Sequence, residues 1–292
     1  MRYGILTLML TALCALAAGA AQDAPPVWYY VALGDSIGAG YNNGERSYVG
    51  AYARAVAEDT GAEVRIINKS RPGWRTRELL AALRQDGTFR TSVQNARMVS
   101  WNIGSNDLLL ARQDYLDGRC GGADGQDCMR RAQAEVEANW VAIAEEVLAL
   151  RPAERHLLRA LDFYNPLVDE DRARDSWAED GECADLDGDG ACNDFEVFKR
   201  YFDELNAFLR EAAASRGVGL AAVSQTFNGP DGDEDPGARG WLARDGLHPN
   251  DEGHAVIGEA LRLLGYQPLW PESAVDDSDR DGDGVPDDND FC

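Results

Sequence analysis

Three side chains in the sequence have the chemistry of a serine nucleophile with its base. Ser36 lies in the run Gly34-Asp35-Ser36-Ile37-Gly38, whose glycines let a substrate approach the backbone. A serine needs a general base to take its proton, and the chain offers 3 histidines. His248 follows Asp245 by three positions in a loop-like segment, so the carboxylate can bind Nδ1 and leave Nε2 for Ser36. We expect Ser36 to be the nucleophile, His248 the base and Asp245 its orienting acid.

The other two histidines fit this role less well. His156 precedes a predicted strand, at the wrong end of the sheet, and His254 lies within the last predicted helix, where an exposed or capping histidine is the default expectation. Each motif also has a simpler interpretation when it is taken alone. The motif around Ser36 is then a Gly-Ser turn without chemistry. The Asp245–His248 motif is then a hydrogen bond that stiffens the start of a helix.

Two further loops supply donors for the oxyanion of a tetrahedral intermediate. Gly73 follows Arg71-Pro72 and can present a bare backbone N–H to a ligand. Asn106, in Gly-Ser-Asn-Asp, carries an amide NH₂ that donates hydrogen bonds. Each follows a predicted strand, so both candidates belong to the end of the sheet where Ser36 lies.

These residues are positioned by strands that alternate with amphipathic helices. Apolar, β-branched runs predict five strands: Tyr29–Leu33, Val64–Asn68, Met98–Ile103, Leu157–Leu161 and Leu220–Val223. Apolar residues at helical spacing predict the helices between and after them: Tyr48–Asp59, Thr76–Arg84, Ala132–Leu150, Phe195–Ala214 and Asp251–Leu264. Strands joined by crossover helices make a parallel sheet, so we expect a three-layer α/β/α sandwich. Ligands bind such sheets at the carboxyl ends of the strands.

The motifs together resemble the GDSL, or SGNH, hydrolase family of serine esterases and lipases. Its four hallmark residues occur here in family order as Ser36, Gly73, Asn106 and His248, over roughly residues 27–265. The resemblance implies a flavodoxin-like five-stranded fold and an oxyanion hole made by the N–H groups of Ser36 and Gly73 and the Asn106 side chain. Ile37 replaces the leucine of the family name, which is a tolerated change.

Length and charge exclude several other classes of protein. The 292 residues, 45% of them hydrophobic, can bury a sizeable core, and no apolar run after the first twenty residues is long enough to cross a bilayer. The net charge of −23 argues against binding to nucleic acid or to anionic lipid. Three segments carry most of this charge: 169–196, 231–235 and 276–292. Such concentration favours local cation sites over a uniformly acidic surface.

The first of these segments contains a calcium-loop template. Residues 165–196 interrupt the strand–helix alternation as an acidic insertion, and residues 185–196 match the EF-hand loop at every ligand position. The expected ligands are Asp185, Asp187, Asp189, Ala191 through its carbonyl, Asn193 and Glu196. The remaining alternative is a solvated acidic loop. We expect calcium to have a structural role, because serine chemistry needs no metal.

The acidic tail, residues 271–292, repeats the pattern and resembles a thrombospondin type 3 repeat. Its expected ligands are Asp279, Asp281, Asp283, Val285, Asp287 and Asp290. The alternating acids Asp231, Asp233 and Asp235 are followed by Pro236 and lack a twelfth-position acid, so they predict a loop.

The N-terminus has the order of a secretory signal peptide, namely a charge, an apolar run and small residues. We expect residues 1–20 to be removed near Ala20 and the protein to be secreted or periplasmic, where disulfides form. Proximity pairs Cys120 with Cys128 and Cys183 with Cys192. Cys292 is left over, and three states stay open for it: a free thiol, an intermolecular contact, or a bond to a partner that the sequence does not reveal.

The sequence therefore predicts a secreted serine esterase for a small ester substrate, with calcium as a structural ion and no catalytic cofactor. The ester belongs to a lipid or an acylated carbohydrate, and thioesterase, lysophospholipase and carbohydrate O-deacetylase activities remain open. The alternative outside the enzymes is a calcium-dependent adhesion module that has the same fold.

Overall fold

A five-stranded sheet, parallel throughout, forms the centre of the computed structural model, which describes residues 25–41, 46–176 and 193–269. The strand order is β2-β1-β3-β4-β5. The strands are β1 (Val27–Gly34), β2 (Glu63–Asn68), β3 (Met98–Asn102), β4 (Leu157–Leu161) and β5 (Gly219–Ala221). This confirms the predicted fold class, and each strand overlaps its predicted range.

Side chains alternate between the two faces of the sheet and build two cores. On β1, Val31 and Leu33 belong to one buried cluster, whereas Tyr30 and Ala32 belong to the other. A strand with both faces covered reads as a continuous apolar run, which is what β1 is. β3 is also buried along its whole length, although Ser100 and Asn102 are polar.

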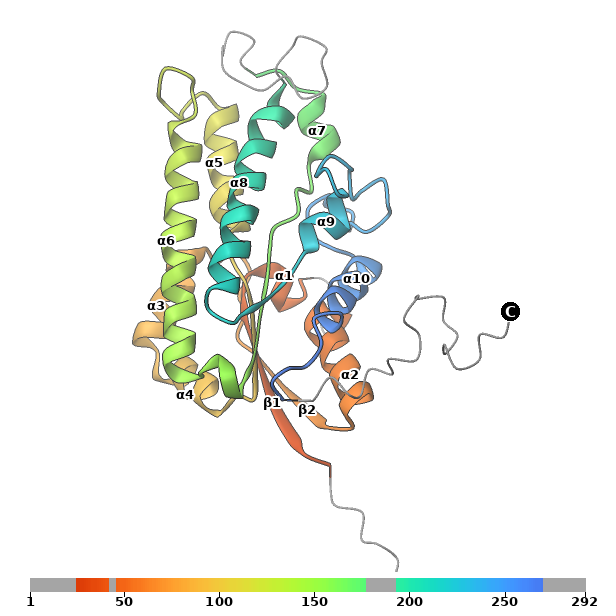
Figure 1. The fold of residues 1–292 in the computed structure, drawn as a ribbon. Helices are drawn as coiled ribbons and strands as arrows, with labels where there is room; N and C mark the ends of the chain where they lie inside the picture. Colours follow the sequence, from red (N-terminus) through yellow and green to blue (C-terminus); the bar gives the residue numbers. More distant parts are fainter. Residues whose placement is uncertain (1–24, 42–45, 177–192, 270–292) are drawn as a thin grey trace, which may run out of the picture.

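Helices cover both faces of the sheet, as Figure 1 shows. One layer contains α3 (Thr76–Gln85), α4 (Gly87–Asn95), α5 (Ser105–Leu116), α6 (Asp127–Leu150) and α8 (Asp194–Ala214). The other contains α2 (Tyr48–Thr60), α9 (Val223–Asn228) and α10 (Asp251–Arg262). Two short helices, α1 (Ser36–Ala39) and α7 (Val168–Arg172), follow the carboxyl ends of β1 and β4.

Five of the described helices were not predicted from the sequence: α1, α4, α5, α7 and α9. α5 carries leucines at consecutive positions 108–110, so no helical face stands out. The last strand is shorter than predicted because Val223 begins α9. The cause is a tertiary contact: the Asp162 carboxylate accepts hydrogen bonds from Ser224 N, at 2.8 Å, and Ser224 Oγ, at 2.6 Å.

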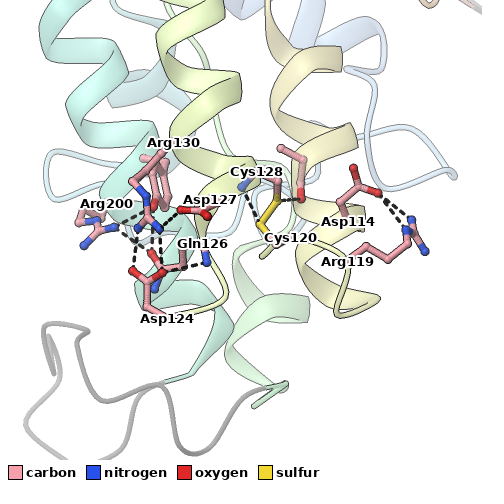
Figure 2. The surroundings of a disulfide bond; sticks show 11 residues. Asp114, Arg119, Cys120, Asp124, Gln126, Asp127, Cys128, Arg130 and Arg200 are labelled. Carbon is pink, nitrogen blue, oxygen red and sulfur yellow. Dashed lines mark hydrogen bonds and ion pairs between the residues drawn. A yellow bond between two sulfur atoms is a disulfide. The ribbon is translucent and has the colours of Figure 1, made fainter. Parts of the chain in front are cut away.

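A disulfide closes the loop between α5 and α6. Cys120 and Cys128 are bonded, with their Cα atoms 4.7 Å apart, as the first of the two predicted pairs requires. Figure 2 shows ion pairs flanking it, with Arg130 bound to Asp124 and Asp127 on one side. The connection into α6 is therefore covalently and electrostatically fixed.

Several predicted features lie outside the described residues. These are the signal peptide at 1–20, the pair Cys183–Cys192, the first four ligands of the EF-hand-like loop, the tail at 271–292 and Cys292. Within the described ranges, no helix combines the length and apolar character needed to span a membrane.

Candidate active site

Ser36, His248 and Asp245 form a continuous hydrogen-bonded chain. Ser36 is the first residue of α1, directly after β1, and its Oγ lies 2.8 Å from Nε2 of His248. The other ring nitrogen, Nδ1, lies 2.7 Å from Oδ2 of Asp245. The structure thus brings the three predicted residues together in the predicted order, although 212 positions separate Ser36 from His248.

A hairpin-like loop presents His248 to Ser36. Leu242 pairs with Pro249 in an antiparallel bridge, and Ala243 N donates to the His248 carbonyl at 2.7 Å. From the segment that follows β4, the Tyr164 hydroxyl donates to the carbonyl of Leu247 at 2.6 Å. The imidazole is therefore held from both ends of its loop before any substrate binds.

The Asp245 carboxylate is kept ionised by hydrogen bonds. Burial alone would raise its pKa, but Oδ1 accepts from the N–H groups of His248 and Leu247, and Oδ2 faces the His248 ring. These bonds outweigh burial and hold the pKa of Asp245 below its usual value. An ionised Asp245 keeps the proton of neutral His248 on Nδ1, so that Nε2 can accept from Ser36.

Glycines let the nucleophile turn press against the end of β3. A Cβ added to Gly34 would lie 2.2 Å from the backbone oxygen of Asn102, and φ at Gly34 is 144°. A Cβ on Gly38 would lie 2.6 Å from Oδ1 of Asn102. No side chain fits in either place, so both glycines are required by close approach.

Asn102 connects this turn to α2. Its Nδ2 donates to Asp35 Oδ1 at 2.6 Å, and its Oδ1 accepts from the Tyr48 hydroxyl at 2.7 Å. Asp35 Oδ1 also accepts from Ile37 N at 3.0 Å and so caps α1. Burial raises the pKa of Asp35 to about 6, because its carboxylate is 1% exposed.

The candidate oxyanion donors lie in the segments that follow β1, β2 and β3. Ser36 is the first residue of α1, a position whose N–H has no partner within its helix. Arg71 N donates to the Gly34 carbonyl at 2.9 Å, so the segment after β2 is bound to the end of β1. Gly73 lies in the turn that follows Arg71 and has a φ of 77°. Asn106 donates one amide hydrogen to the Trp74 carbonyl at 2.8 Å and keeps its second for a ligand.

A pocket of about 70 Å³ opens beside the nucleophile. Its polar lining comes from Asp35, Ser36, Ser105, Asn106 and His248, and the remaining lining from Ile37, Leu109, Tyr164, Pro166, Phe202 and Leu247. Among the described residues, Gly73, Trp74 and Trp241 are not part of this lining. Trp74 instead stacks on Phe89, with ring centroids 5.7 Å apart, and Trp241 packs against Phe227.

One sequence expectation about a histidine is wrong. His254 is 1% exposed, and its Nδ1 accepts a hydrogen bond of 3.2 Å from Tyr48 N, so it is a core residue that supports α2. Burial lowers its pKa to about 4, which keeps the ring neutral. His156 lies just before β4, at the far end of that strand from Tyr164, as predicted.

Sequence reasoning missed several residues around the site. The ring of Tyr41, 44% exposed, packs on His248 with centroids 4.8 Å apart. Tyr164 and the apolar lining from α5 and α8 were also missed. Asn102 alone had a detectable signal, as a polar residue near the carboxyl end of a mostly apolar strand.

Parts of the acidic segments are described. Asn193 caps α8 by accepting from Glu196 N, and Glu196 accepts from Asn193 N, both at 3.2 Å. Asp235 accepts backbone hydrogen bonds from Gly237 and Asp169, so the acids at 231–235 form a loop, as predicted. Over residues 25–41, 46–176 and 193–269, no group of three or more metal-ligating side chains is gathered.

Comparison with known proteins identifies similar chains. The profile of the GDSL-like lipase/acylhydrolase family matches residues 32–256. The chain is 24% identical over 241 residues to the spore germination lipase LipC of Bacillus licheniformis, covering 81% of this chain and 96% of that one.

Solved structures share the fold. A lipase from a goat rumen metagenome, Lip_vut3, superposes with a TM-score of 0.66 at 23% identity, covering 83% of this chain and 100% of the other. The acetylxylan esterase Axe2 of Geobacillus stearothermophilus gives 0.54 at 19% identity, covering 83% and 96%.

Proposed function

The chain belongs to the GDSL-like lipase/acylhydrolase family, and on that premise we propose that it hydrolyses carboxylic esters or thioesters through Ser36, His248 and Asp245. Membership makes it a lipase or esterase of that family. The observation that carries the assignment of residues is the unbroken chain of contacts, 2.8 Å from Ser36 to His248 and 2.7 Å from His248 to Asp245.

Acylation begins when Nε2 of His248 takes the proton of Ser36. Oγ then bonds to the carbonyl carbon, and the π electrons of the carbonyl move to its oxygen. When the tetrahedral intermediate collapses, the bond to the alcohol breaks and the alcohol takes the proton from Nε2. Asp245 stabilises the imidazolium that exists between these two transfers.

Deacylation repeats the sequence with water. Water gives a proton to Nε2 as its oxygen bonds to the acyl carbon, and collapse returns that proton to Ser36 Oγ and releases the acid. In both halves the oxyanion accepts hydrogen bonds from Ser36 N, Gly73 N and the free amide hydrogen of Asn106. Loss of one such donor costs roughly 3 to 4 kcal/mol of transition-state stabilisation in other enzymes.

Turnover of p-nitrophenyl esters by the mature protein and by Ser36→Ala tests this proposal. We expect hydrolysis by the first and loss of at least about a thousandfold in kcat for the second. Unchanged turnover in Ser36→Ala would contradict the assignment. A purely adhesive protein would show no turnover in either, and the aligned His248 and Asp245 argue against it because binding does not need them.

A carbohydrate O-deacetylase is the second candidate. The small pocket beside Ser36 favours it, since an acetyl group fits within about 70 Å³, and one of the similar folds is an acetylxylan esterase. Release of acetate from acetylated xylan would support it. Hydrolysis of simple esters without any release of acetate from acetylated polysaccharide would rule out the deacetylase.

Calcium is proposed as a structural ion of the loop that precedes α8. In an EF-hand loop the residue at position twelve is a glutamate that binds the ion through both carboxylate oxygens. Glu196 occupies that position of the template, and its capping bonds with Asn193 hold it in the first turn of α8. The oxygen-rich set is chemically suited to calcium, and none of its members takes part in the serine chemistry.

Export is proposed from the N-terminal pattern. The disulfide between Cys120 and Cys128 supports it, because such bonds persist in oxidising compartments. Mass spectrometry of the exported protein, with a new N-terminus near residue 21, tests the proposal, and an intact N-terminus in the cytosolic fraction would contradict it.

A further inference from the structure

The pocket beside Ser36 has two chemically different sides. The side chains of Ser36, His248 and Asn106 supply its reacting and polar groups. Leu109 from α5, Pro166 after β4 and Phe202 from α8 supply an apolar wall. None of these three wall residues belongs to the motifs that identify the family.

We propose that this pocket holds the acyl group of the ester and admits only short acyl chains, with Phe202 as the residue that sets the limit. The inference rests on the proposed function, since it concerns the substrate of that same site.

The positions of Asn106, the oxyanion donor, and His248, the base, decide whether the acyl half or the alcohol half of the ester enters the pocket. Asn106 binds the carbonyl oxygen in the proposed mechanism, so the acyl carbons lie next to α5, on which Asn106 and Leu109 are neighbours within one turn. The leaving oxygen must lie at His248 Nε2, which protonates it. The His248 side chain is 21% exposed, and Tyr41, packed on it, is 44% exposed, so the alcohol half points to solvent.

The size of the pocket sets the length of the chain. A cavity of about 150 Å³ in an engineered protein core holds benzene, with its six carbons. The pocket here measures about 70 Å³, roughly half as much. It therefore accommodates about three or four carbons, which corresponds to acyl groups from acetyl to butyryl.

The wall cannot easily widen, because an ion pair clamps the elements that carry it. Arg112, one turn after Leu109 on α5, donates from Nε to Asp171 Oδ1 at 3.0 Å, and Asp171 lies on α7 shortly after Pro166. Asp171 is 1% exposed, so the pair is strongly held. Phe202 itself is 9% exposed and packs in the core under the sheet.

The test is a series of p-nitrophenyl esters from acetate to octanoate with a constant alcohol. For the wild type we expect kcat/KM to fall at least about tenfold between butyrate and octanoate. Phe202→Ala enlarges the pocket and should raise the octanoate-to-acetate ratio by about tenfold or more, whereas Phe202→Trp should lower the butyrate-to-acetate ratio. Phe208→Ala, a half-buried phenylalanine of the same helix outside the lining, should leave the profile unchanged.

A second series separates the two halves of the ester. With acetate esters of longer and longer alcohols, Phe202→Ala should have the same profile as the wild type. A change confined to this series, or a wild-type preference for octanoate, would overturn the inference while leaving the esterase intact. Absence of turnover on every ester, or turnover that survives in Ser36→Ala, is instead a failure of the proposed function.

Discussion

The amide of Asn102 donates a hydrogen bond of 2.6 Å to the carboxylate of Asp35, the residue that precedes the nucleophile. Through this bond the end of β3 fixes the turn that carries Ser36. The geometry of the nucleophile therefore depends on a residue that never meets the substrate in the proposed mechanism, and Asn102 is a positioning residue.

Removal of this amide should slow the chemistry more than it weakens binding. We expect Asn102→Ala to lower kcat by about 10- to 100-fold with KM changed only a few-fold, because small displacements of a reacting group cost that much. Ser100→Ala on the same strand removes a buried bond to Tyr30 and is the control. Both variants should lose about 1 to 3 kcal/mol of unfolding free energy, but only the first should lose kcat. Equal kinetic effects would contradict the positioning role.

Asn106 should stabilise the transition state and not the bound ground state. Asn106→Ala is expected to lower kcat by about 10²- to 10³-fold with little change in KM, as for other oxyanion donors. Asn139→Ala, which removes an amide that binds Thr76 outside the pocket, serves as the comparison and should keep its kcat. A rise in KM at constant kcat would show that Asn106 only binds the ground state.

Asp35 should make stability depend on pH. Burial raises its folded pKa from 3.8 to about 6, so between these values the native state holds a proton that the unfolded chain has lost. Stability from this group is therefore present below about pH 4 and is lost as pH rises through about 6. The unfolding free energy of the wild type minus that of Asp35→Asn should fall by up to about 3 kcal/mol between these limits. Urea titrations between about pH 4 and about pH 6 measure this difference in unfolding free energy. A difference that is independent of pH would contradict the raised pKa of Asp35.

Calcium should stabilise the fold without entering the reaction. Saturating calcium should raise the unfolding free energy by about 2 to 3 kcal/mol, as expected at a hundredfold excess over Kd. Asp187→Asn should lose most of this gain, while Asp231→Asn, in the loop after α9, should keep it. If chelator leaves the urea midpoint of the wild type unchanged, the calcium proposal fails.

Local patterns were sufficient to predict the sheet and the hydrogen-bonded set of Ser36, His248 and Asp245. Apolar runs indicate buried strands, and the three residues lie in short motifs that can be recognised without knowledge of the packing. The pocket wall was not predictable, because Leu109 and Phe202 have no local mark and meet only when α5 and α8 pack together. The burial of His254 has the same origin: its partner, Tyr48 N, is 206 positions away in the sequence.

Covalent labelling tests the central claim most directly. A fluorophosphonate should add a single phosphonyl group, located by mass spectrometry on the peptide that contains Ser36, and Ser36→Ala should remain unlabelled. His248→Ala should react at least about a thousandfold more slowly, while His254→Gln should react at the wild-type rate. Labelling at another residue, together with ester turnover that persists in Ser36→Ala, would contradict the account.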